Sequence, residues 1–323
     1  MNRVAAVLGI VIAIAGCGGE RVRVRETTPV ALGESRLTVS GGGIWYRVTG
    51  TNAGTPVVLL HGGPGFSSYY LKPLEALGDE RIVVRYDQLG AGKSDTTTDT
   101  TLFNIPHFVG ELDSLRSHLG IARWHLLGHS WGTILALEYY RAHPDRVASL
   151  TFGSPVLDIP AYARHALRLV TTLSDSSQRA VSMALATGRF DSPGYEGAIN
   201  EFYGRYVFRH PVQADLDSTF ATANQRLYGY MQGPSEFTVT GTLKNYDATS
   251  FLPAIRVPTL FTVGEFDEVG PELVREHASR VPGAHFELLA GSAHITPWDA
   301  PEKNIAVVRA FLRGADSLAA RRQ

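Results

Sequence analysis

Residues 128–132 read Gly-His-Ser-Trp-Gly, and their surroundings constrain the fold of this chain more than any other feature. A short apolar run, 124–127, comes directly before them, and a helical pattern begins at about Thr133. A serine between two glycines at a sharp strand-to-helix turn is typical of a nucleophile elbow, where a side chain at either flank would collide with neighbouring backbone. The turn also places the Ser130 hydroxyl at the positive end of the following helix. The segment therefore predicts an activated serine on an α/β sheet.

Strand and helix signals alternate along most of the chain, which predicts a mostly parallel sheet flanked by helices. Short apolar runs bounded by turn residues are typical of strands buried on both faces. The expected strands are 37–39, 44–48, 56–61, 81–86, 124–127, 147–152, 257–263 and 285–289. Helices are expected at about 108–119, at 133–142 and from about 301 onward. The first two strands form a predicted hairpin across 41–43.

The alternation stops between 155 and 251, where the chain reads as several helices without a convincing strand pair. A helical block inside a parallel-sheet fold is most simply a lid over the carboxyl edge of the sheet, where such folds bind ligands. We therefore expect a core formed by 36–154 and 252–316, with 155–251 as an inserted helical lid.

The N-terminus has the layout of an export signal. Arg3 precedes an apolar run, 4–16, of 13 residues, whereas a bilayer span needs about 20. Residues 14–17 (Ile-Ala-Gly-Cys) resemble the lipobox of bacterial lipoproteins, and Cys17 is the sole cysteine, so it cannot form an internal disulfide. We expect lipidation of Cys17, a tether at 18–35 and an exported protein whose membrane contact is the lipid anchor alone. An ordinary cleaved signal with an incidental cysteine is the alternative.

Composition excludes several classes of partner. The chain has 323 residues with 30 Lys and Arg against 31 Asp and Glu, so a net charge of −1 gives no electrostatic reason to expect nucleic acid. His125 and His129 are four residues apart, but they flank a strand and a turn and do not share a helix face. The sequence has no H-E-x-x-H motif, phosphate-binding loop or dinucleotide fingerprint. We therefore expect neither a metal nor an organic cofactor.

A serine nucleophile needs a base and an acid that orients the base, in the chain order Ser, acid, His. Asp267 follows the expected strand 257–263, and His294 follows 285–289, so each lies in a loop at a strand's carboxyl end. We expect Ser130, Asp267 and His294 to form the catalytic triad. The alternative acids are Glu265 and Asp158, and the alternative bases are His277 and His285.

An oxyanion hole is expected beside this serine. Residues 61–65 (His-Gly-Gly-Pro-Gly) follow a buried strand, and glycines let backbone N–H groups approach a ligand closely. In such folds this loop supplies one donor and the residue after the nucleophile supplies the other. We assign the N–H groups of Gly63 and Trp131.

These motifs resemble those of the proline iminopeptidases, a branch of the α/β-hydrolases. The resemblance rests on 60–65 (Leu-His-Gly-Gly-Pro-Gly), 86–94 (Tyr-Asp-Gln-Leu-Gly-Ala-Gly-Lys-Ser) and 128–132. Residues 233–241 (Gly-Pro-Ser-Glu-Phe-Thr-Val-Thr-Gly), 264–268 (Gly-Glu-Phe-Asp-Glu) and 292–294 (Ser-Ala-His) are similar to the tricorn-interacting aminopeptidase members. The similarity spans about 39–311 and implies an α/β-hydrolase fold with a helical lid. Thr133 departs from the family, which commonly has a second glycine there.

The resemblance also implies an activity, because this family cleaves one residue, often proline, from a peptide's free N-terminus. By motif position, Glu236 and Glu268 would bind the substrate's α-ammonium, and the hydroxyl of Tyr228, or of Tyr230, would face the reacting carbonyl. The implied substrates are short peptides or amino-acid derivatives with a free N-terminus. Three alternatives remain open: an amidase or esterase on small amino-acid derivatives, a lipid-anchored binding protein without turnover, and a lipase.

Overall fold

The computed structural model describes residues 30–321. The expected signal, Cys17 and most of the expected tether lie outside the described residues. Within residues 30–321 we find no helix with both the length and the apolarity that crossing a bilayer requires.

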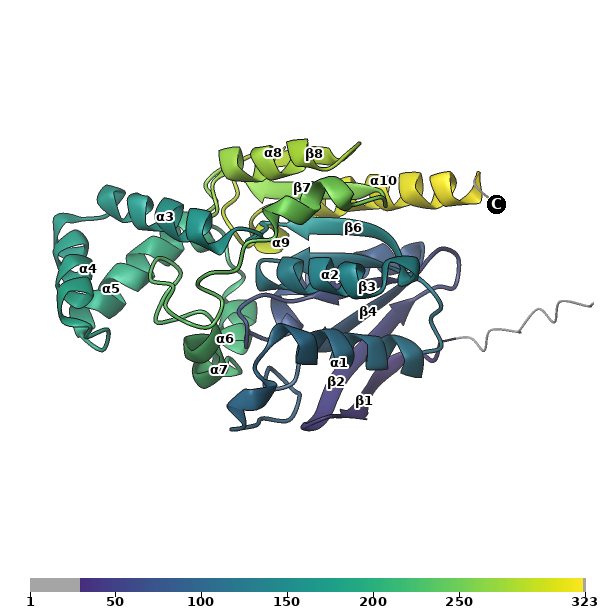
Figure 1. The fold of residues 1–323 in the computed structure, drawn as a ribbon, viewed down its shortest axis with the longest axis horizontal. Coiled ribbons are helices and arrows are strands. Elements are labelled where there is room, and N and C mark those ends of the chain that lie inside the picture. The colour runs from purple at the N-terminus through teal and green to yellow at the C-terminus, as the bar shows by residue number, and fades with distance from the viewer. Residues whose placement is uncertain (1–29, 322–323) are drawn as a thin grey trace, which may run out of the picture.

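An eight-stranded sheet forms the centre of the molecule, with the strand order β1-β2-β4-β3-β5-β6-β7-β8 (Figure 1). The strands are β1 (Gly33–Val39), β2 (Gly42–Gly50), β3 (Val57–Leu60), β4 (Ile82–Asp87), β5 (Trp124–His129), β6 (Val147–Gly153), β7 (Thr259–Gly264) and β8 (His285–Leu289). The β1–β2 hairpin and the β2–β4 pair are antiparallel, and all later neighbours are parallel. The predicted α/β class and the mostly parallel sheet are confirmed.

Helices cover the sheet, and the central strands β3, β4, β5 and β7 are therefore buried along their whole length. The helices of the core are α1 (Ile105–His118), α2 (Trp131–Ala142), α8 (Pro271–Arg280), α9 (Thr296–Asp299) and α10 (Pro301–Ala320). The side chain of Asn104 accepts a hydrogen bond from the His107 N–H and so caps the start of α1. A buried 3₁₀ segment, Ser68–Asp79, was not predicted, because Pro73 interrupts its helical pattern.

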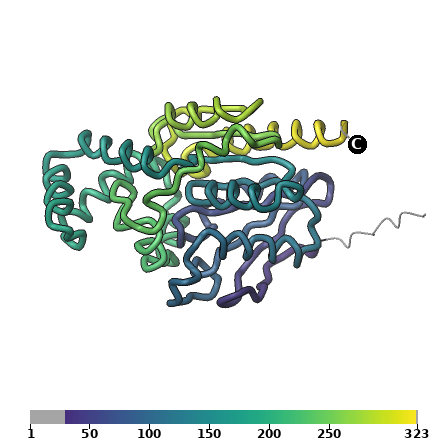
Figure 2. The backbone as a smooth tube through the Cα atoms, viewed as in Figure 1, coloured from purple at the N-terminus to yellow at the C-terminus, as the bar shows by residue number. Residues whose placement is uncertain are grey.

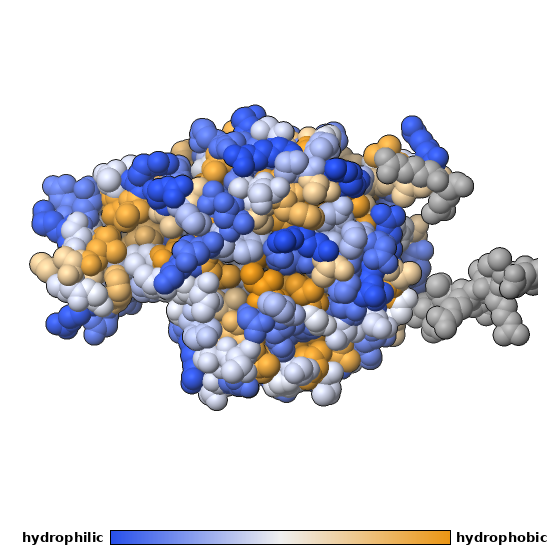
Figure 3. All heavy atoms as spheres, viewed as in Figure 1, coloured by the Kyte–Doolittle hydropathy of each residue, from blue (hydrophilic) through white to orange (hydrophobic). Residues whose placement is uncertain are grey.

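Between β6 and β7 the chain forms helices that project beyond the carboxyl edge of the sheet, at the left of Figures 1 and 2. They are α3 (Ile159–Leu169), α4 (Asp175–Thr187), α5 (Pro193–Phe202), α6 (Gln213–Ala221) and α7 (Gln225–Met231). We call the segment from α3 to α7, with the loop that follows it, the lid. Hydrophilic and apolar residues are intermixed on the face of the molecule shown in Figure 3.

The first strand begins earlier than the sequence suggested. β1 starts at Gly33, inside the range expected as tether, and pairs there with Val48. The Glu34 carboxylate accepts hydrogen bonds from the Trp45 indole and the Lys93 ammonium, 3.1 Å each. These contacts attach the start of the strand to the sheet, and the local sequence does not reveal them.

Candidate active site

Ser130 lies on a strained turn between β5 and α2. Its φ of 54° and ψ of −124° fall in a region that side-chain-bearing residues rarely adopt. A Cβ on Gly128 would lie 2.2 Å from the Gly132 carbonyl oxygen, and a Cβ on Gly132 would lie 2.1 Å from the Leu60 carbonyl oxygen. Both glycines are therefore required by backbone packing at this elbow.

Thr133 holds the elbow from the helix side. Its hydroxyl donates to the Ser130 carbonyl oxygen at 2.6 Å and accepts from the Val156 N–H at 3.3 Å. The departure from a second glycine thus adds two hydrogen bonds, one within the elbow and one to the loop between β6 and α3.

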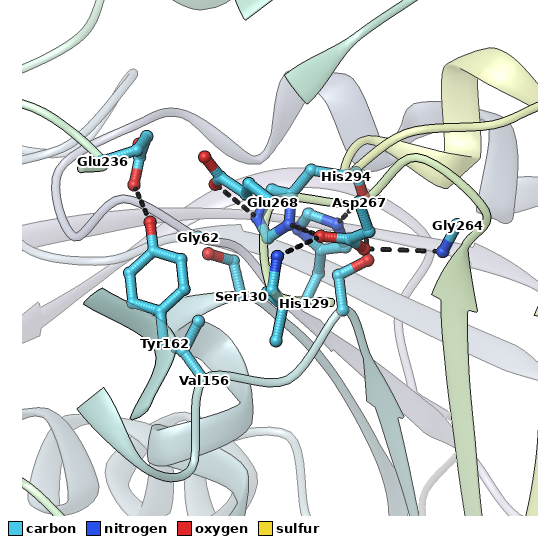
Figure 4. Close-up of polar contacts among 12 residues, drawn as sticks. Gly62, His129, Ser130, Val156, Tyr162, Glu236, Gly264, Asp267, Glu268 and His294 are labelled. Atoms are coloured by element: carbon cyan, nitrogen blue, oxygen red, sulfur yellow. Dashed lines mark hydrogen bonds and ion pairs between the residues drawn. The ribbon is translucent and has the colours of Figure 1, made fainter. Parts of the chain in front are cut away.

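Asp267 and His294 meet at the carboxyl ends of β7 and β8 (Figure 4). His294 Nδ1 lies 2.8 Å from Asp267 Oδ1, which also accepts from the Val269 N–H at 3.0 Å. Burial alone would raise the pKa of Asp267. The pKa is nevertheless lowered, because the charge of His294 and the hydrogen bond that His294 donates favour the ionised carboxylate. Burial likewise opposes the charged form of His294, and the Asp267 carboxylate outweighs burial and raises the His294 pKa. The pair therefore favours an ionised aspartate and a basic imidazole.

The alternative acids and bases lie elsewhere. Glu265 is exposed and accepts from the Gly291 N–H, and Asp158 caps the start of α3. His277 is buried within α8, and His285 is exposed at the start of β8. None of these side chains replaces Asp267 or His294 in the contact between the two loops.

Ser130 and His294 line one cavity beneath the lid, together with Gly63 and Glu236. Gly63 and Trp131 line an adjoining cavity that also reaches Ser130. Over residues 30–321, the N–H groups of Gly63 and Trp131 have no hydrogen-bond acceptor. Two unoccupied backbone donors beside a serine are the arrangement that stabilises an oxyanion.

Glu236 comes to this cavity from the lid. Its two carboxylate oxygens accept from the hydroxyls of Tyr162 and Tyr228, at 2.8 Å each. The Tyr228 hydroxyl is thereby directed at Glu236. Tyr230, the alternative tyrosine, is 40% exposed and packs against Phe103.

Glu268 is buried beside His294. One carboxylate oxygen lies 3.7 Å from His294 Nε2, and the other has no hydrogen-bond partner within the described part of the chain. Burial first, and then the charges of Glu236 and Asp267, raise the pKa of Glu268 well above its ordinary value. Neither Glu268 nor Glu236 forms an ion pair with a lysine or arginine of residues 30–321. Glu236 in the cavity wall and Glu268 behind it, beside His294, are therefore two acidic groups without a cationic partner among the described residues.

His129 and Tyr70 connect residues 61–65, which we call the oxyanion loop, to residues 290–295, which we call the base loop. Neither residue was assigned a role in the sequence analysis. The Gly62 N–H donates to the Tyr70 hydroxyl at 2.7 Å, and that hydroxyl lies 2.9 Å from His129 Nδ1. His129 Nε2 lies 2.8 Å from the His294 carbonyl oxygen. Burial, followed by the charge of His294, lowers the His129 pKa to about 3, so this ring is neutral and donates from Nε2. As the variable residue inside the 128–132 motif, His129 carries no signal of this role.

The described residues hold no group of three or more His, Cys, Asp or Glu side chains that could bind a metal ion.

Comparison with known proteins defines the class first. Residues 55–301 match the family model of the α/β hydrolase fold. The proline iminopeptidase of Heyndrickxia coagulans is 40% identical, with 86% of this chain and 98% of that protein covered. That of Saccharolobus solfataricus is 35% identical, covering 84% and 89%. The crystal structure of proline iminopeptidase from Mycobacterium smegmatis superposes with a TM-score of 0.81 at 31% identity, covering 88% and 99%.

The chain is thus an α/β-hydrolase. It belongs to the proline iminopeptidase family, as the motifs of the sequence indicated, and is an enzyme of the serine hydrolase, aminopeptidase type.

Proposed function

We propose that this protein is a serine exopeptidase that releases an N-terminal residue, with proline favoured, from short peptides. The observation that carries the proposal is a pair of acidic residues near His294: the half-buried Glu236 lines the cavity of Ser130, and the buried Glu268 lies 3.7 Å from His294 Nε2. The names of the family relatives support the same substrate class. An amidase or esterase acting on small amino-acid derivatives would use the same serine, and the experiment below separates the two.

In the proposed mechanism the Ser130 hydroxyl attacks the substrate carbonyl while His294 Nε2 takes its proton. Asp267 holds Nδ1 and stabilises the imidazolium. The N–H groups of Gly63 and Trp131 stabilise the oxyanion, and each such donor contributes on the order of 3 kcal/mol in comparable sites. His294 then protonates the leaving amine, and water releases the residue from the acyl-enzyme.

The two glutamates would select a free amine. An ammonium group that enters a closed site loses hydration, and well-placed carboxylates offset this loss. Because Glu236 is fixed by Tyr162 and Tyr228, its oxygens are already oriented before substrate arrives. An N-blocked substrate would enclose both acidic groups without providing a cation, which disfavours its binding.

The remaining cavity wall suits a compact apolar side chain such as the proline ring. Aromatic and aliphatic residues form this wall: Phe66, Tyr203, Val207, Phe220 and Ile295. Apolar enclosure stabilises a ring by burial, and these five residues offer no ionic partner to a charged side chain.

Hydrolysis of prolyl-, alanyl- and N-acetyl-prolyl-arylamides tests this proposal. We expect fast release from the prolyl compound, loss of activity on acetylation and no activity in Ser130→Ala. Glu236→Gln and Glu268→Gln should each raise KM for the free-amine substrate at least tenfold, since a charge-assisted contact is lost. Glu265→Gln is the matched control, because Glu265 is exposed in the same loop as Glu268.

Cleavage that is indifferent to acetylation would remove the amine site and favour an esterase or amidase. Retained activity in Ser130→Ala would contradict the nucleophile assignment itself.

We further propose that Cys17 is lipidated and anchors an exported enzyme to a bacterial membrane. The short apolar core and the lipobox-like residues 14–17 support this. In a bacterial host, the full chain should incorporate a labelled fatty acid and sediment with membranes, and Cys17→Ser should do neither. Equal labelling of both proteins would overturn the proposal.

A further inference from the structure

A segment of the lid lies directly against two loops of the core. One is the base loop, and the other is residues 265–269, which contain Asp267 and Glu268 and which we call the acid loop. We call residues 206–210 the strap. The Tyr206 carbonyl oxygen accepts from both the Glu268 N–H at 3.3 Å and the His294 N–H at 3.2 Å, and the Val207 carbonyl accepts from the Ile295 N–H at 2.7 Å. The strap begins within a π-helical turn, Tyr203–Val207, a geometry that recurs at functional sites.

Asp299, at the end of α9, joins the strap to the base loop. One of its oxygens accepts from the N–H groups of Arg209 at 2.8 Å and His210 at 2.7 Å, and the other accepts from the Ala293 N–H at 2.8 Å. Within residues 30–321, Asp299 forms no ion pair with a lysine, arginine or histidine. Its carboxylate therefore interacts mainly with these three backbone N–H groups. Charge-assisted bonds of this kind are among the stronger ones in proteins.

The core holds His294 from the opposite side. Its carbonyl oxygen accepts from the Ser154 hydroxyl at 2.9 Å and lies 2.8 Å from His129 Nε2. The backbone of the base loop is therefore fixed at its carbonyl by the core and at three successive N–H groups, 293–295, by the strap and Asp299.

We propose that Asp299 is a positioning residue that couples the lid to the catalytic base. With Asp299 in place, docking of the strap fixes the backbone position of His294 and the ring attached to it. Without it, the lid still covers the cavity but the base loop moves relative to Ser130. This inference rests on the proposed function, because it assigns His294 the role of base.

The test is Asp299→Asn, compared with wild type on prolyl-arylamide. An asparagine has one acceptor oxygen, so it can keep either the two strap bonds or the Ala293 bond, but not both. We expect kcat to fall ten- to a hundredfold, as small displacements of a reacting group do, with KM within about threefold of wild type. Amide exchange at 293–295 and in the strap should accelerate together. Asp217→Asn is the matched control and should change neither constant, because Asp217 is an exposed acid of α6 whose carboxylate, within residues 30–321, accepts a side-chain hydrogen bond only from Gln213.

A kcat within twofold of wild type in folded Asp299→Asn would overturn the proposal, as would a loss confined to KM. If that variant does not fold, Phe266→Ala replaces it. Phe266 stacks on the Arg209 guanidinium, which lies 4.1 Å from its ring centre, and this stacking joins the strap to the acid loop. The proposal then requires a lower kcat at unchanged KM, and an unchanged kcat contradicts it.

The Ser130→Ala variant keeps the two hypotheses separate. If Ser130→Ala is inactive and Asp299→Asn has normal activity, the proposed function stands and only the coupling fails. If wild type and Ser130→Ala cleave equally, the proposed function itself fails.

Discussion

At the scale of single residues, burial and neighbouring charges have different effects on the pKa values of Asp267, His294 and Glu268. Asp267 and His294 stabilise each other's charged forms against burial, whereas Glu268 is penalised by burial and by two neighbouring carboxylates. Two consecutive residues of one loop, Asp267 and Glu268, therefore have shifted pKa values of opposite direction, the first lowered and the second raised. Such divergence is typical of sites in which two acids have different tasks.

The pH dependence of kcat/KM should report the protonation state of His294. Because Asp267 raises the His294 pKa, we expect the acid limb of the wild-type profile above pH 6.5, with activity lost as pH falls through it. Asp267→Asn removes the stabilising charge, so the limb should move to lower pH while the plateau falls by up to about 10⁴-fold. Profiles measured in Glu268→Gln separate the titration of Glu268 from that of His294. An acid limb that stays in place in Asp267→Asn would show that another group controls it.

At the scale of elements, the elbow depends on how closely α2 approaches β3. Gly132 is in the first turn of α2, and its Cα lies against the carbonyl end of Leu60. This approach brings the Trp131 N–H and the Gly63 loop to the same side of Ser130. Helix packing against the sheet thus sets the geometry of the oxyanion donors.

Two glycine substitutions in helices should have opposite effects. In Gly132→Ala the new Cβ would meet backbone at 2.1 Å, so we expect a loss of at least about 2 kcal/mol in unfolding free energy, together with a collapse of kcat. In Gly110→Ala, on α1, nothing lies within 4 Å of the new Cβ, and the variant should gain about 0.5–1 kcal/mol with normal activity. Denaturant unfolding and arylamide assays measure both. A Gly132→Ala protein with wild-type stability would contradict the packing argument.

At the scale of the whole molecule, a buried acid away from the cavity affects global stability. Glu111 of α1 accepts from the Leu89 N–H at 3.0 Å, and its other oxygen has no partner within the described residues. The Tyr86 hydroxyl and His107 Nε2 nearby are also buried without partners there. Burial raises the pKa of Glu111 to about 8, so the folded protein holds this proton at neutral pH.

Glu111→Gln should therefore change how stability depends on pH. The folded state keeps the Glu111 proton while the unfolded chain releases it above about pH 4.5, so the wild-type stability contribution is lost as pH rises from about 4.5 to 8. Gln keeps an acceptor for the Leu89 N–H and does not ionise. As pH rises over this range, the unfolding free energy of wild type should fall relative to that of Glu111→Gln, by up to a few kcal/mol. A constant difference from pH 5 to pH 8 would refute the assignment.

The sequence by itself determined the order of the eight strands and the positions of α1, α2 and α10. Each of those signals is local: an apolar run, a capping residue such as Asn104, or glycines around Ser130. It also placed Asp267 and His294 at the ends of successive parallel strands, and chain order alone brings such positions to one edge of the sheet. The family motifs singled out Glu236 and Glu268 in the same way.

Only the tertiary structure decided which side chains support that site. The contact of His129 with His294 joins residues 165 apart in the chain, and the Tyr162–Glu236 bond joins residues 74 apart. Asp299 likewise binds the strap 89 and 90 residues away. Each of these bonds has one end in an irregular loop, which has no hydrophobic period and whose position follows from packing of the lid on the core. Local sequence therefore indicates the reacting groups, whereas the groups that position them emerge only when distant loops are brought into contact.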